Sequence, residues 1–68
     1  MSYHAGYISD VMVNFQLLEE GGREFYIWWR RDNGNAIQSL HAALKHFEGT
    51  EILTKFKIFW VTYALEHR

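Results

Sequence analysis

The sequence feature that most limits the possible folds is a run of large side chains over residues 25–31, FYIWWRR. Aromatic and β-branched residues are favoured in strands, and a strand shows alternate side chains to opposite faces. One face would carry Phe25, Ile27 and Trp29, and the other Tyr26, Trp28 and Arg30. A chain of 68 residues has little material with which to cover both faces. The run therefore predicts a strand with one face in the core and one open aromatic face.

A second alternating segment precedes this run. Apolar residues at 11, 13, 15 and 17 alternate with Met12, Asn14, Gln16 and Leu18, which is the period of a half-buried strand. Gly21-Gly22 lies between the two segments, and paired glycines between strand patterns indicate a hairpin. A register that pairs Glu19 with Arg23 keeps the apolar residues together, whereas a slip of one residue mixes the faces. We expect a β-hairpin over residues 10–31.

The next segment changes to a helical period. Residues 32–35 offer several N-cap candidates, and Ile37, Leu40, Leu44 and Phe47 then form one apolar stripe. Gly49 follows at a position suited to a helix C-terminus. The pattern predicts a helix over residues 35–48.

Residues 51–65 fit two interpretations. Phe56, Phe59, Trp60 and Tyr63 match a helical stripe, but β-branched and aromatic residues crowd the segment as they do in strands. A lone hairpin on one helix is barely stable, which favours a third strand over residues 53–65. The helical alternative stays open.

These elements predict one domain over residues 1–68, of class α+β and order ββαβ. Residues 1–8 would be a leader. A right-handed crossover would place the third strand beside the first, giving a three-stranded antiparallel sheet of order 2-1-3 packed against one helix.

Size and composition favour self-association. A domain of this length buries little surface and usually needs disulfides, a metal or oligomerisation. The chain has no cysteine, while 49% of its residues are apolar and 18% aromatic. Both faces of the expected third strand are apolar, which is unusual on a monomer. We therefore expect a homodimer whose interface includes Phe56, Ile58 and Trp60.

No motif indicates catalysis, a metal or a cofactor. The sequence has no cysteine nucleophile, no G-x-S-x-G and no phosphate-binding loop. His41 and His46 are five residues apart, so on a helix they point about 140° apart and cannot chelate together. The expected protein is not an enzyme. No signal peptide or apolar run of membrane-spanning length is evident, which makes the cytoplasm the expected location.

The open sheet face is the expected functional surface. Tyrosine, tryptophan and arginine dominate binding hot spots, and here they lie beside polar neighbours. The partner-binding residues are predicted to be Tyr26, Trp28, Arg30, Asn14 and Gln16. The format resembles the small inhibitors of phages and mobile elements, which block a host enzyme or defence complex. Two alternatives remain: a single-stranded nucleic-acid binder using sheet aromatics, disfavoured by the net charge of −1, and a structural subunit that mainly self-associates.

Overall fold

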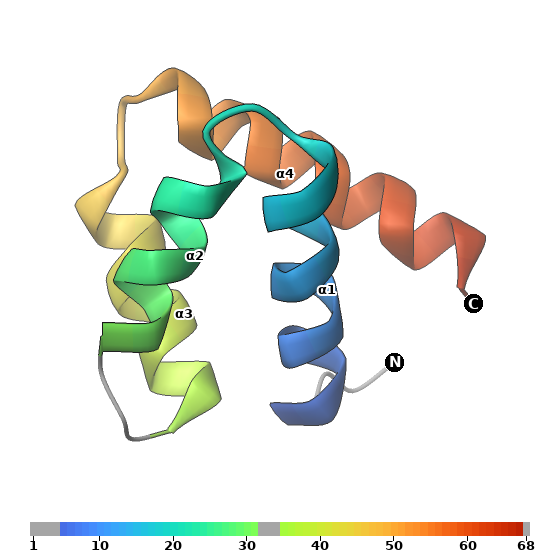
Figure 1. Cartoon of the computed structure of the whole chain (residues 1–68), viewed down its shortest axis with the longest axis horizontal. Coiled ribbons are helices and arrows are strands. Elements are labelled where there is room, and N and C mark those ends of the chain that lie inside the picture. Colours follow the sequence, from blue (N-terminus) through green and yellow to red (C-terminus); the bar gives the residue numbers. More distant parts are fainter. Residues whose placement is uncertain (1–4, 32–34, 68) are drawn as a thin grey trace.

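The structure, a computed structural model, describes residues 5–31 and 35–67 and contains four helices in them (Figure 1). The helices are α1 (Ala5–Leu18), α2 (Gly22–Arg31), α3 (Ala36–His46) and α4 (Glu51–Glu66). No strand occurs among these residues, so the predicted α+β fold with its three-stranded sheet is wrong. The expected hairpin over 10–31 is the α1–α2 pair, and the expected third strand over 53–65 lies inside α4. Residues 1–4 of the expected leader lie outside the described residues, and α1 already begins at Ala5.

The first three helices stand side by side, and each runs opposite to the one before it (Figure 1). α4 crosses them and packs against α1 and α2, while its C-terminal half extends beyond α1 (Figure 1). The connections are short, as is usual between antiparallel helices. This arrangement leaves much of α4 uncovered, and the site described below depends on that.

A cluster of four phenylalanines joins all four helices. Phe15 of α1 lies 5.7 Å from Phe25 of α2 and 5.1 Å from Phe56 of α4 between ring centroids. Phe47, at the C-cap of α3, lies 5.1 Å from Phe25. All four rings are buried. Because aromatic side chains bury much area per residue, this cluster gives a short chain a substantial core.

The buried residues of α1 follow the helical period. Ile8, Val11, Met12 and Phe15 are buried and are spaced i, i+3, i+4 and i+7, which places them on one side of a helix. Leu17, which strand alternation assigned to the core face, is 71% exposed. The alternation of residues 11–18 was therefore an incidental pattern within a helical stripe.

The aromatic run that predicted a strand is also helical. Phe25 and Trp29 are four residues apart on α2 and are both buried, whereas Ile27 is half exposed. The indole Nε1–H of Trp29 donates a hydrogen bond to the carbonyl oxygen of Ala36, at 3.2 Å, and so ties α2 to the start of α3. Trp29 thus lies in the core, where alternation had also placed it, but Ile27 does not accompany it.

The paired glycines form a tight turn between helices instead of a hairpin turn. Gly21 has a φ of 86°, a conformation that residues with a side chain rarely adopt. Gly22 begins α2 against α1, and a Cβ there would collide with the carbonyl oxygen of Phe15. The two glycines therefore set the close approach of α1 and α2.

The helix predicted over residues 35–48 is present as α3. The Asn35 side chain caps it by accepting hydrogen bonds from the backbone N–H groups of Ile37 and Gln38. Thr50 caps α4 in the same way through the N–H of Leu53. The helical alternative for the last segment is thus confirmed.

Candidate protein-docking surfaces

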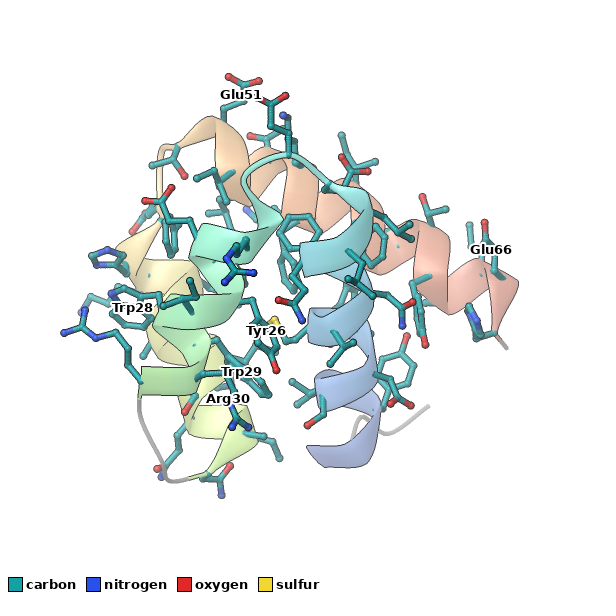
Figure 2. All side chains as sticks on the ribbon, in the orientation of Figure 1. Tyr26, Trp28, Trp29, Arg30, Glu51 and Glu66 are labelled. Atoms are coloured by element: carbon teal, nitrogen blue, oxygen red, sulfur yellow. The ribbon has the colours of Figure 1, made fainter. Side chains whose placement is uncertain are left out.

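The five residues predicted to bind a partner do not share a face, because the sheet that would have united them is absent. Tyr26 and Arg30 are one helical turn apart on α2, while Trp28 points away from both (Figure 2). On α1, Asn14 donates a hydrogen bond from Nδ2 to the carbonyl oxygen of Asp10, at 2.8 Å. Gln16, two residues later, is half-buried on another side of that helix.

The expected self-association face is also divided. Phe56 is buried in the core, and Trp60 lies half-buried one turn later on the same side of α4. Ile58 points to the opposite side and is 64% exposed. A helix separates residues i and i+2 by about 200°, so these three residues could share a face only in a strand.

The outward side of α4 carries an apolar stripe that we call the α4 ridge: Ile58, Val61 and Leu65. Their exposed fractions are 64%, 57% and 59%. The spacing i, i+3, i+7 lines them up along one side of the helix. The opposite side carries the residues that pack on the core, among them Phe56 and Phe59. α4 therefore exposes a narrow apolar stripe on its uncovered side, with polar residues such as Thr54 and Thr62 beside it.

An apolar groove lies between α3 and α4 next to this ridge. We call it the α3–α4 groove; its volume is about 380 Å³ and its lining consists of Leu40, Leu44, Phe56, Lys57, Trp60 and Val61. Lys57 is the one charged residue of the lining. The ring of Tyr7 meets Trp60 edge-on at 5.6 Å between centroids, which holds the indole in place. Val61 belongs to both ridge and groove, so the two form one continuous surface.

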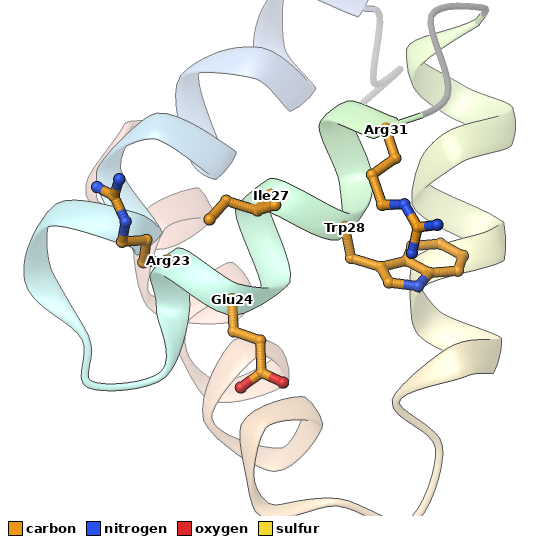
Figure 3. Close-up of a pocket in the computed structure, with 5 residues that line it drawn as sticks. All are labelled: Arg23, Glu24, Ile27, Trp28 and Arg31. Carbon is orange, nitrogen blue, oxygen red and sulfur yellow. The ribbon is translucent and has the colours of Figure 1, made fainter.

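A second hollow lies on the outer side of α2 (Figure 3). We call it the α2 hollow; its volume is about 450 Å³ and its lining consists of Arg23, Glu24, Ile27, Trp28 and Arg31. The Trp28 indole stacks on the His46 ring of α3, with centroids 4.5 Å apart and planes 17° apart. The ring of Phe47 is nearly perpendicular to the same indole, with the two ring centroids 6.3 Å apart. Trp28 is therefore partly exposed but packs against His46 and Phe47.

Charge is distributed unevenly over the described residues. α2 carries three arginines and one glutamate, and Lys45 lies in the last turn of α3. Acidic residues gather near the turns that precede α2 and α4, at Glu19, Glu20, Glu48 and Glu51. Lys55 pairs with Glu51 at 3.8 Å across one exposed turn, a type of ion pair that contributes little stability.

Sequence analysis missed several residues of these surfaces: Leu44, Val61, Leu65, Arg23 and Arg31. The signal was present, since residues 58, 61 and 65 have helical spacing and residues 23, 27 and 31 recur every four. It was concealed because both segments were interpreted as strands, whereas Leu44 was assigned to the core-facing stripe of the helix over residues 35–48. Strand alternation groups different residues.

Comparisons with protein-family models, curated proteins and solved structures gave no match. Among residues 5–31 and 35–67, no group of three or more histidine, cysteine, aspartate or glutamate side chains could hold a metal ion. Within the same residues, none of the helices has the length and apolar character needed to cross a membrane.

Proposed function

We propose that the protein is a non-catalytic binding module whose α3–α4 groove takes an amphipathic helix of another protein. The observation that carries this proposal is the apolar character of α4 on its uncovered side. Contiguous exposed apolar side chains with polar residues around them mark interaction sites, and the α4 ridge with the adjoining groove has this character. Docking of a helix into an apolar groove is a recurrent way to cover such a surface.

The lining of the groove indicates the chemistry of the partner. Apolar side chains from two helices form its walls, so a third helix inserting leucine-type side chains would complete a helical packing unit. Lys57 is the single charge in the lining, and no acidic residue lies there to pair with it. A carboxylate beside the apolar stripe of the partner would meet this ammonium group. The matching partner is an amphipathic helix with an acidic residue at the border of its apolar stripe.

A bound helix would have to cover both the groove and the α4 ridge. Stable complexes bury about 800 Å² on each partner. The three residues of the α4 ridge supply only part of such an area, so the groove must contribute the remainder. Because Val61 joins ridge and groove, one helix lying along α4 would cover both.

Binding alone would give such a module a biological effect, since it would cover a surface that its partner needs. The inhibitor expected from the sequence would act in this way. The proposed location is the cytoplasm.

The test uses the indole N–H signals of the three tryptophans in a proton–nitrogen NMR spectrum. Trp60 lines the groove, Trp28 lines the α2 hollow and Trp29 is buried. The probe is an alanine-based helical peptide with leucines at i, i+4 and i+7 and one glutamate beside them. We expect it to shift the Trp60 signal and to leave the Trp29 signal in place.

A second peptide, identical except for lysine in place of glutamate, is the matched control and should bind more weakly. Lys57→Glu should reverse this preference. An unmoved Trp60 signal at saturating peptide would overturn the proposal. A concentration-dependent dimer of the free protein that Val61→Glu abolishes would also overturn it, because the ridge would then be covered by a second copy.

A further inference from the structure

We propose that the α2 hollow is a second docking surface, and that it binds an acidic helical segment with two carboxylates on either side of an apolar side chain. It shares no residue with the α3–α4 groove. The inference goes beyond the proposed function, since it would give one small chain two separate contact surfaces.

The first argument is the spacing along α2. Arg23, Ile27 and Arg31 recur every four residues, so they follow one side of the helix. With a rise of 1.5 Å per residue, the two arginine backbones are about 12 Å apart, and Ile27 lies midway between them. All three side chains are exposed and line the hollow (Figure 3). The surface is therefore a cationic site, an apolar site and a second cationic site in a line.

The second argument is the fixed position of Trp28. Its indole is stacked on His46 and touched by the edge of Phe47, so binding would cost little side-chain entropy. Rigid, partly exposed tryptophans are typical anchors of binding surfaces. Trp28 and Ile27 together form the apolar part of the lining, between Arg23 and Arg31.

The third argument is charge complementarity. The hollow contains two arginines and one glutamate, and Lys45 in the last turn of α3 adds a further positive charge. Arginine binds carboxylates through two parallel hydrogen bonds, which favours an acidic partner. In a partner helix, acidic residues seven or eight apart lie about 10–12 Å apart, which matches the arginine spacing. An apolar residue midway between them would meet Ile27.

Nucleic acid is the rival partner for a basic surface with a tryptophan. It is disfavoured because Glu24 lies inside the hollow and would repel a phosphate backbone. One face of the Trp28 indole is already occupied by His46, which leaves only one side for a base. A partner made of protein can place its carboxylates away from Glu24.

The test again uses the indole N–H signals, with an alanine-based helical peptide that carries two glutamates eight residues apart and a leucine midway. It should shift the Trp28 signal and leave the Trp60 signal unchanged. The matched control peptide has lysines in place of both glutamates and should bind at least tenfold more weakly. This readout is separate from that of the α3–α4 groove, so either surface can fail while the other is supported.

Three protein variants make the test specific. Arg23→Gln and Arg31→Gln should each weaken binding about threefold to fivefold, the range of exposed ion pairs. Arg30→Gln is the matched control, because it removes the same charge from the last turn of α2 outside the hollow. The Trp29 signal reports that each variant is folded.

Three results would overturn the inference. One is equal binding of the glutamate and lysine peptides, and another is an equal loss of affinity in Arg30→Gln and Arg31→Gln. The third is a Trp28 signal that shifts with an oligothymidine, steeply dependent on salt, but not with the glutamate peptide. That third result would identify a nucleic-acid surface.

Discussion

Phe25 of α2 and Phe56 of α4 stack with their ring centroids 4.5 Å apart and their planes 23° apart. This contact joins the second helix to the last one across the centre of the molecule. It fixes the N-terminal half of α4, while the α4 ridge further along the helix stays exposed. The core and the α4 ridge therefore lie on opposite sides of one helix, and Phe56 belongs both to the core and to the lining of the α3–α4 groove.

Phe56→Ala should lower the free energy of unfolding by about 3–5 kcal/mol, because it removes a buried ring from the phenylalanine cluster. Ile58→Ala, only two residues away, should change that free energy by no more than about 0.5 kcal/mol, since Ile58 is exposed. Urea denaturation followed by circular dichroism measures both. Similar losses in the two variants would place both residues on one buried face and contradict the helix.

The neighbours Trp28 and Trp29 should respond differently to truncation. Trp29→Ala should cost about 3–5 kcal/mol of stability, because Trp29 is buried and donates a hydrogen bond to Ala36. Trp28→Ala should cost less than half as much, since it removes a partly exposed ring whose contacts are to His46 and Phe47. Thermal unfolding of both variants under one condition gives the comparison. Equal shifts in Tm would contradict the difference in burial.

Substitution of Gly22, which lies where α1 and α2 meet, should destabilise the protein more than substitution of Gly49 in the last turn. Gly22→Ala should destabilise the protein by more than 2 kcal/mol, because the new methyl group collides with the backbone of Phe15. Gly49→Ala should cost only about 1–2 kcal/mol, the strain of a positive φ, since nothing lies near a Cβ there. Urea midpoints of the two variants test this order. A milder effect at Gly22 would mean that α1 and α2 separate easily.

The capping side chains should contribute measurably to stability. Asn35→Ala and Thr50→Ala should each cost about 0.5–2 kcal/mol, because backbone N–H groups at the starts of α3 and α4 lose their acceptors. Asn35→Asp is the matched control and should retain most of the stability, since its carboxylate also accepts these hydrogen bonds. Chemical denaturation of the three variants provides the test. A loss in Asn35→Asp as large as in Asn35→Ala would show that the cap is not what stabilises α3.

The sequence allowed α3 to be predicted because its signals agree. A helical stripe, a capping asparagine and a closing glycine all point to the same element. In α1 the signals conflict, since residues 11–18 alternate while residues 8, 11, 12 and 15 fit a helix. The helical set is the one that the core covers. Over so few residues the two periods share positions 11 and 15, so periodicity alone could not decide between them.

The α2 and α4 segments were mistaken because strand propensity was given too much weight. Aromatic and β-branched residues are favoured in strands mainly where they pack on a pleated surface, and tertiary contacts override that preference. Here the phenylalanine cluster supplies those contacts to helices. The residues that line the two candidate surfaces on α2 and α4 could be grouped only with the helical period, not with strand alternation. Trp28 was predicted to contact a partner and lines the α2 hollow, but its neighbours Arg23, Ile27 and Arg31 were not grouped with it.

The two glycine turns also determine where this chain can be cut or extended. The turn at Gly21-Gly22 has no room even for a methyl group at its second residue. The turn at Gly49 faces open space, and its capping residue, Thr50, follows the glycine. A tag inserted between Glu48 and Gly49 would keep the hydrogen bond from the N–H of Leu53 to Thr50, but it would disturb the two hydrogen bonds that the N–H and hydroxyl of Thr50 donate to the carbonyl oxygen of Phe47 across this turn. A probe is therefore better attached to the exposed side chain at position 48, with the chain left unbroken between Phe47 and Thr50.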